Sequence, residues 1–156
     1  GIEMSRKDTE EFERLYRAYQ TEISLSEGVE EFLDYCKSHN IFIAILTNGR
    51  PKSQYAKVIA LDLHRWFDDD HIFISGGIGY QKPDPMAFQY IEKMFSLNPE
   101  ETWYIGDTYE ADVVGADGAG WHTVWFNHRN RERLENCADV TVRSIEELSR
   151  FIKERS

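Results

Sequence analysis

The chain has 156 residues, of which 41% are hydrophobic and 29% are charged, proportions that suit one globular domain of common size. Its formal net charge of −10 argues against general binding to nucleic acid or to acidic membranes, because both draw their affinity from basic protein surface. No apolar run approaches the length of a membrane span and no signal-peptide pattern appears, so we expect a soluble, cytoplasmic protein.

The first third of the chain alternates helical and strand patterns. Asp8 and Glu11 have the spacing of a capping box, and the apolar residues that follow predict an amphipathic helix over residues 8–20. A second helix is predicted over residues 27–38. The apolar run 41–46, rich in β-branched residues, then predicts a strand covered on both faces by helices.

The turn after this strand has the composition of a phosphate-binding loop. Thr47, Asn48 and Gly49 follow the strand, and Pro51 is well placed to open a helix over residues 51–62. Backbone N–H groups at a helix N-terminus can hold a phosphate, and Thr47 adds a hydroxyl donor. An ordinary turn selected for its geometry is the alternative interpretation. Arg50 and Lys52 nearby are interpreted as solvated surface charges rather than as substrate contacts.

Two motifs in the middle of the chain invite functional interpretations that we do not favour. The run Asp68-Asp69-Asp70 resembles a cation site, but it follows the end of a helix, so we expect a solvated loop before a strand over residues 71–75. The run Gly76-Gly77-Ile78-Gly79 lacks the third glycine of a dinucleotide-binding fingerprint, and we expect no helix to open on it. The sequence therefore argues against a nicotinamide or flavin site.

Lys82 stands in a stiff segment. It precedes Pro83, and Asp84 precedes Pro85, so both residues are confined to extended or turn conformations. Asp84 can cap a helix that begins at Pro85 and runs to about residue 97. A lysine on a flexible surface loop is the usual alternative, but the two prolines favour a positioned ammonium group.

The segment from Trp103 onward predicts a strand that is followed directly by an aspartate. A short apolar run stops at Gly106, Asp107 follows at once, and Asp112 comes in the first turns of a helix predicted over residues 109–118. This is the pattern of a parallel strand that delivers a carboxylate to the carboxyl end of a sheet, where ligands of α/β folds bind. A simple turn or N-cap role for Asp107 is the alternative. Small residues in the predicted helix are expected to allow close packing against the sheet.

The C-terminal part of the chain completes the alternation. We predict strands over residues 121–126 and 138–142, the second at a sheet edge, and a last helix capped by Ser144. The polar loop 128–135 has no assignable chemistry. The remaining polar candidates show no ligand spacing and are interpreted as structural histidines and free thiols: His39, His64, His71, His122, Cys36 and Cys137.

Together these elements predict an α/β fold with a doubly wound, mostly parallel sheet. In such a fold Thr47, Lys82 and Asp107 all fall at or just beyond the carboxyl ends of strands. One cleft is therefore expected to gather a hydroxyl, an ammonium and a carboxylate.

Three segments carry a resemblance to a known family. They are Leu46-Thr47-Asn48-Gly49, Gly79 to Pro85 with Lys82, and Gly106-Asp107-Thr108 with Asp112. In order and spacing they resemble the second, third and fourth motifs of the haloacid-dehalogenase-like superfamily. The resemblance covers residues 23–156, which implies a Rossmann-like core, and residues 1–22 resemble the closing part of the helical cap that many members carry.

The resemblance implies a Mg²⁺-dependent phosphohydrolase that acts on a small phosphorylated metabolite through an aspartyl-phosphate. It implies that Lys82 neutralises charge on the phosphate and the nucleophile, that Asp107 ligates Mg²⁺, and that Asp112 supports the metal directly or through its water shell. It also implies a phosphate-binding loop made of three residues, Thr47, Asn48 and Gly49. Magnesium prefers a few carboxylates together with waters and phosphate oxygens, which agrees with this set of residues.

The sequence departs from the family at its first motif. An apolar strand ending in Asp-x-Asp-x-Thr or Val, which supplies the nucleophile, is absent, and Asp68 and Asp70 follow the wrong structure to replace it. We therefore expect that the chain is a fragment or processed form of a longer phosphatase, lacks its central strand and is inactive by itself. The alternatives are a non-catalytic phosphate-binding or regulatory domain, and a receiver domain, for which the motifs come in the wrong order.

Overall fold

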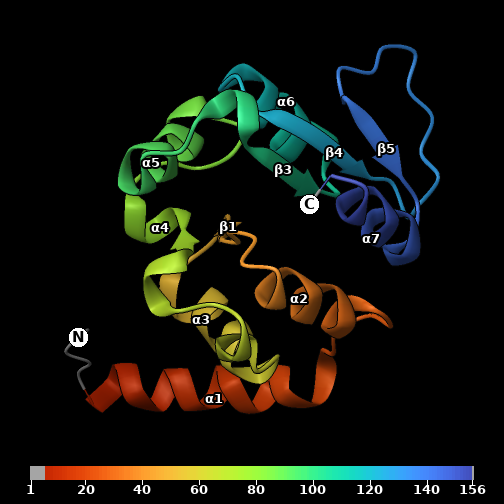
Figure 1. Ribbon diagram of the computed structural model, residues 1–156. Coiled ribbons are helices and arrows are strands. Elements are labelled where there is room, and N and C mark those ends of the chain that lie inside the picture. Colours follow the sequence, from red (N-terminus) through yellow and green to blue (C-terminus); the bar gives the residue numbers. More distant parts are fainter. Residues whose placement is uncertain (1–5, 156) are drawn as a thin grey trace. The chain divides into compact units, whose positions relative to one another are not determined.

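The computed structural model describes residues 6–155, and the chain divides into two compact units, Gly1–Gly77 and Ile78–Ser156. Figure 1 shows their elements, coloured along the chain. Every strand pair among the described residues is parallel, which confirms the predicted α/β class. None of the described helices combines the length and the apolar character that crossing a membrane requires.

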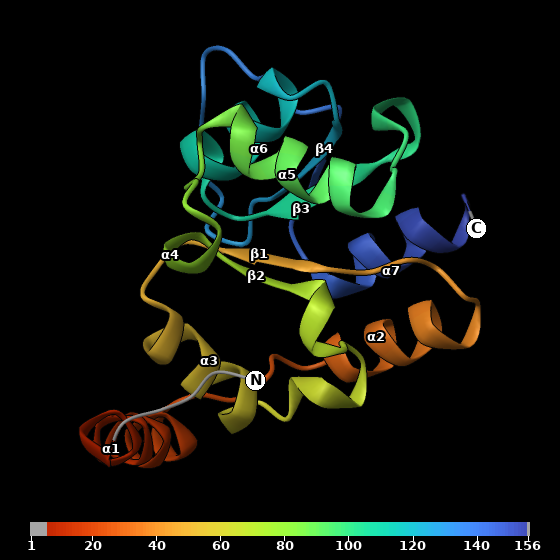
Figure 2. The ribbon, with the colours of Figure 1, turned by 90° about the vertical axis from the view of Figure 1, so that its left-hand side faces the viewer.

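The first unit contains a two-stranded sheet and the helices around it. Strand β1 pairs with β2 (Figure 2). In their register Ile45 lies opposite Ile72. Helix α1 lies along α3, where the Tyr19 hydroxyl is 3.2 Å from Ser53 Oγ. In chain order the elements are α1 (Arg6–Glu22), α2 (Val29–Ser38), β1 (Ile45–Thr47), α3 (Pro51–Ala60), η1 (Leu63–Arg65), η2 (Asp69–His71), β2 (Ile72–Ile74) and α4 (Ser75–Ile78).

The predicted start of α3 is confirmed in this unit, whereas the predicted start of α1 is wrong. Pro51 occupies the first turn of α3, as predicted. Asp8, in contrast, lies inside α1 and pairs with Lys52 of α3, so it does not cap the helix at the predicted boundary. The packing of α1 on α3 gave this carboxylate a tertiary partner, which the sequence spacing alone did not reveal.

Both strands of the first unit are shorter than predicted. Strand β1 consists of Ile45–Thr47 and pairs with the three-residue strand β2, although the apolar run starts at residue 41. Residue 75 leaves the predicted strand and begins α4, so a short helix does include Gly76, contrary to expectation. Gly76 N–H donates to the carbonyl oxygen of Gly49 at 3.1 Å. A Cβ there would lie 2.8 Å from that oxygen, which explains the glycine by close packing.

The second unit contains the three-stranded sheet in the order β3, β4, β5, with β5 at an edge as predicted. Trp103 lies opposite His122, and Gly106 opposite Trp125. The core gathers around Phe88, which is fully buried. The elements are α5 (Pro85–Phe95), η3 (Pro99–Glu101), β3 (Trp103–Gly106), α6 (Tyr109–Gly118), β4 (His122–Phe126), β5 (Val140–Val142) and α7 (Ile145–Lys153).

Helix caps and tight packing fix the helices of this unit. Asp84 accepts a hydrogen bond from Met86 N at the start of α5, and Ser144 accepts one from Glu147 N at the start of α7, as predicted. A Cβ on Gly115 would lie 2.8 Å from Phe88 Cε2 and 2.9 Å from the Pro83 backbone. Gly115 therefore allows α6 to approach the proline segment and α5 closely, and α6 also packs against β3 and β4, as expected.

The boundary between the units differs from the predicted domain boundary. We expected residues 1–22 to form a cap remnant and residues 23–156 to form the core, whereas α1 packs with α3 inside the first unit. The assignment of residues 1–22 to a cap stays a prediction.

Candidate functional site

Lys82 and Asp112 form an ion pair in the second unit. Lys82 Nζ donates to Asp112 Oδ1 at 2.6 Å and to the Tyr104 hydroxyl oxygen at 2.7 Å. Only 11% of the Lys82 side chain and 6% of the Asp112 side chain are exposed. The ammonium predicted from the proline segment is thus held by a buried carboxylate from α6 and a phenol from β3. The Lys82–Pro83 peptide bond that follows it is cis.

The backbone around Asp112 explains the spacing of the acidic motif. Asp112 Oδ2 accepts a hydrogen bond from Thr108 N at 2.9 Å, which ties the side chain to the turn between β3 and α6. A Cβ on Gly106 would lie 2.3 Å from Asp112 Cβ, so residue 106 has to be glycine for the carboxylate to pack there. Both carboxylate oxygens of Asp112 consequently accept hydrogen bonds from inside the unit.

Tyr104 accepts a second hydrogen bond from the Lys82 ammonium, beside the one that Asp112 accepts. Burial and, after it, the negative charge of Asp112 raise the pKa of Tyr104 well above its ordinary value. The phenol therefore stays protonated at neutral pH, and its oxygen accepts the hydrogen bond from Lys82. Sequence reasoning missed this residue, although alternation along β3 placed it in the strand that delivers Asp107.

Asp107 is the open carboxylate of the site. Its side chain is 41% exposed, and its Oδ2 lies 3.5 Å from His128 Nε2 and 3.6 Å from Arg129 Nη2. Thr108 Oγ1 donates a weak hydrogen bond to Oδ1 at 3.4 Å. The loop 128–135 was expected to carry no chemistry. Its first two residues, His128 and Arg129, nevertheless lie near Asp107. The strand register explains this: Gly106 pairs with Trp125, so the residues just after β4 lie at the same edge of the sheet as Asp107.

The two acids are unequal candidates for a divalent cation. Magnesium is held in proteins by one or two carboxylates, with waters and phosphate oxygens completing its coordination. Asp107 is half-exposed and fits this role, whereas both oxygens of Asp112 already accept hydrogen bonds. The donor set therefore fits a magnesium ion held directly by Asp107.

The predicted phosphate loop lies in the first unit. Thr47 Oγ1 donates to Gln54 Oε1 of α3 at 3.2 Å, and Gly49 N–H donates to Ser75 Oγ at 2.9 Å. Gly49 has φ 150°, and a Cβ on it would lie 2.5 Å from Gln54 Nε2. The turn follows β1 and precedes α3 as predicted, with two polar partners from α3 and α4 that the sequence did not indicate, and its binding of phosphate stays a prediction. Asn48 lies between Thr47 and Gly49 in this loop, whereas Lys82, Asp107 and Asp112 belong to the second unit.

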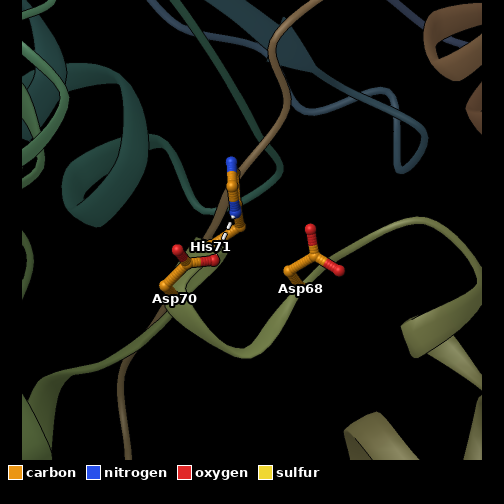
Figure 3. Close-up of side chains that lie close together, drawn as sticks. All are labelled: Asp68, Asp70 and His71. Atoms are coloured by element: carbon orange, nitrogen blue, oxygen red, sulfur yellow. Dashed lines mark hydrogen bonds and ion pairs between the residues drawn. The ribbon is translucent and has the colours of Figure 1, made fainter.

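The acidic run before β2 gathers three ligand-type atoms. Asp68, Asp70 and His71 each offer one such atom, and these atoms lie within 4.8 Å of one another (Figure 3). His71 Nδ1 is 2.7 Å from Asp70 Oδ1, and both aspartates are exposed. We expected a solvated loop and a structural histidine here, and the convergence of His71 on the acids was not predicted. Exposed groups of this kind are common without an ion, so we assign no site to them.

Comparison with known proteins decides the family. The family model described as haloacid dehalogenase-like hydrolase matches residues 3–120, most of the chain. The chain belongs to this family. It is 31% identical over 125 residues to glyceraldehyde 3-phosphate phosphatase of Pyrococcus furiosus, covering 78% of this chain and 51% of that protein. It is 34% identical over 147 residues to phosphoserine phosphatase of Thermus thermophilus, covering 94% of this chain and 57% of that protein.

Solved structures of this hydrolase family share the fold. A HAD phosphatase from Thermococcus onnurineus superposes with a TM-score of 0.79 at 28% sequence identity, covering 90% of this chain and 64% of that one. The chain spans about half the length of the two curated relatives it matches. The resemblance to the haloacid-dehalogenase-like family noted in the sequence is therefore confirmed.

Proposed function

We propose that the full-length protein is a Mg²⁺-dependent phosphohydrolase that removes the phosphate group of a small phosphorylated metabolite. The observation that carries the proposal is the buried pair of Lys82 and Asp112 beside the open carboxylate of Asp107. Phosphoryl transfer depends mainly on positioning and on neutralising negative charge, and this arrangement offers a fixed cation next to a carboxylate. The phosphatase names of the two relatives support the same class of substrate.

The four site residues of the second unit have distinct roles in the proposal. Lys82 provides a positive charge for the phosphate group and for a carboxylate nucleophile, and Asp112 with Tyr104 holds its ammonium in place. Asp107 is the direct magnesium ligand. Asp112 acts on Lys82 and, through the water shell, on the metal. The metal, when bound, would supply further charge neutralisation on the phosphate oxygens.

The loop of the first unit binds phosphate oxygens in the proposal. Thr47 offers its hydroxyl, and Asn48 and Gly49 offer backbone N–H groups. The Thr47 hydroxyl donates to Gln54 and the Gly49 N–H to Ser75, so binding phosphate requires these donors to exchange partners. Gln54 and Ser75 thereby hold the loop in shape until the substrate arrives.

The nucleophile is proposed to come from outside these 156 residues. The sequence contains no apolar strand that ends in Asp-x-Asp-x-Thr. Among the described strands, β1 pairs with β2, and β3 pairs with β4. Without an aspartate nucleophile, the isolated chain is expected to show no phosphatase turnover.

The test compares the full-length protein with the 156-residue chain on a panel of phosphomonoesters that includes glyceraldehyde 3-phosphate and phosphoserine, with Mg²⁺ or with a chelator. We expect Mg²⁺-dependent turnover only from the full-length protein. Asp107→Asn and Lys82→Met should each lower its kcat by about 100-fold or more, and the control Asp70→Asn should not.

Two results would contradict parts of the proposal. Robust Mg²⁺-dependent turnover by the 156-residue chain that is lost in Asp107→Asn would refute the inactivity of the chain. A full-length protein that binds phosphate but hydrolyses no ester would favour the non-catalytic, regulatory alternative.

A further inference from the structure

An arginine-lined cavity lies in the second unit beside the ends of β4 and β5. Its volume is about 480 Å³. Most of its wall comes from the loop 127–136, and the rest comes from Trp125 of β4, from Thr141 of β5 and from Arg143. None of the proposed catalytic residues Lys82, Asp107 and Asp112 lines it.

The charge of this cavity is opposite to that of the chain. Its wall contains three arginines, Arg131, Arg133 and Arg143, and one acid, Glu132, which gives a sum of +2 in a chain of −10. Arg133 pairs with Glu110 and stacks over the Tyr109 ring at 3.9 Å. Within residues 6–155, the guanidinium groups of Arg131 and Arg143 show no hydrogen bond or ion pair. Two cations therefore face the cavity without a compensating acid of their own.

The loop that presents Arg131 is anchored rather than loose. Asn127 is 3% exposed, and its side chain donates to the carbonyl oxygen of Arg131 at 2.9 Å and accepts from Arg131 N at 2.8 Å. Asn127 N–H donates to the carbonyl oxygen of Val142 at 2.7 Å. These bonds tie the start of the loop to β5, so the position of Arg131 is set by the sheet.

A buried donor beside the cavity also lacks a partner. Trp125 is 3% exposed, and its indole Nε1 has no hydrogen-bond acceptor among the described residues. Nearly all buried polar groups in native proteins are hydrogen-bonded, so this indole N–H is an exception, and it belongs to a residue of the cavity wall.

We propose that this cavity binds the phosphate group of a phosphorylated small molecule, at a place separate from the proposed catalytic residues. Guanidinium groups present paired N–H donors that match phosphate oxygens, and a wall charge of +2 matches a phosphate dianion. The fully exposed Leu134 and the Trp125 ring offer apolar surface to the organic part of the ligand. The proposal goes beyond the hydrolase function and does not depend on it.

Titration of the 156-residue chain with inorganic phosphate near neutral pH and low ionic strength, followed by NMR, tests the proposal. The indole N–H signal of Trp125, assigned by its loss in Trp125→Phe, should shift saturably. The double variant Arg131→Gln/Arg143→Gln should raise the dissociation constant about tenfold or more, because charged hydrogen bonds are lost. Arg150→Gln removes an exposed arginine of α7 outside the cavity and should change it less than about twofold.

The controls separate this site from other phosphate binding. Phosphate held only by the Thr47 loop or by Lys82 would shift other signals, leave the Trp125 indole unmoved and overturn the proposal. Equal affinity in the double variant with a native-like spectrum, or an equal shift produced by chloride at the same ionic strength, would overturn it as well.

Discussion

Lys82 Nζ and Asp112 Oδ1 lie 2.6 Å apart, although their residues are 30 positions apart in the chain. The pair joins the proline segment before α5 to the first turn of α6, and both side chains are almost excluded from solvent. The charged form of each buried side chain is stabilised by its partner, since an unpaired ion in a protein interior is strongly unfavourable. The pair therefore links the stability of the second unit to the proposed chemistry.

Replacing Asp112 by asparagine should destabilise the chain. Asp112→Asn removes the carboxylate that pairs with the buried ammonium of Lys82, and we expect the free energy of unfolding to fall by about 3 kcal/mol. The double variant Lys82→Met/Asp112→Asn removes the ammonium as well and should recover much of this loss. Urea denaturation measures both, and a double variant less stable than Asp112→Asn would show that the ion pair is not the source.

The tight contact of α6 predicts a sharp difference between two of its glycines. Gly115→Ala places a Cβ 2.8 Å from Phe88 Cε2 and 2.9 Å from the Pro83 backbone, so overpacking should cost about 2 kcal/mol. Gly118→Ala is the matched control, because its Cβ meets Pro85 Cγ only at 3.4 Å, and alanine favours the helix. Thermal or chemical unfolding should rank Gly118→Ala at or above the unsubstituted chain. Equal stability of the two variants would contradict the packing argument.

Arg129 should compete with a cation for Asp107. Its guanidinium lies 3.6 Å from Asp107 Oδ2, and both side chains are partly exposed. Arg129→Gln is therefore expected to strengthen Mg²⁺ binding by about threefold at low ionic strength, with a smaller gain in high salt. The measurement is a Mg²⁺ titration of the chain. Arg150→Gln removes the same charge far from Asp107 in sequence, and an equal gain in that variant would reveal only a net-charge effect.

The Asp139 carboxylate predicts a pH effect on stability. Burial by itself raises its pKa, but hydrogen bonds from Thr123 and the nearby His122 outweigh burial and lower the pKa below its ordinary value. A carboxylate with a lowered folded-state pKa contributes stability above its unfolded pKa and loses it as the pH falls through the folded one. When the pH falls from neutral to strongly acidic, the free energy of unfolding should therefore decrease less for Asp139→Asn than for the unsubstituted chain. Urea unfolding at each pH measures this difference. Parallel acid profiles would refute the role of Asp139.

Local pattern was sufficient for six of the seven α-helices in the described residues and for the order of these elements, whereas α4 was not predicted. The bounds of α6 agree with the predicted 109–118, because the end of an apolar run at a glycine and the start of a helix are encoded by adjacent residues. The caps at Asp84 and Ser144 are equally local, since each side chain bonds a backbone N–H two or three residues away. The family motifs depended on short spacing of the same kind, and the family match agrees with them.

Strand lengths and side-chain partners required the tertiary structure. The run 41–46 contributes only two residues to β1, which pairs with the short strand β2. The length of a strand depends on its neighbour in space, and the sequence of one segment does not specify that neighbour. The family resemblance implied that Asp112 supports a metal, and only the tertiary structure shows that its oxygens accept hydrogen bonds from Lys82 and Thr108. His128 and Arg129 reach Asp107 only because β3 and β4 are in register.

By itself the sequence determined the α/β class, the helix boundaries set by caps and prolines, and the three motifs that carry the family. The tertiary structure decided which charges meet: Lys82 with Asp112, Arg129 with Asp107, and an arginine-lined cavity in a chain of net negative charge. The physical reason is that propensities and caps act between neighbours in sequence, whereas burial and electrostatic interactions depend on distances in space.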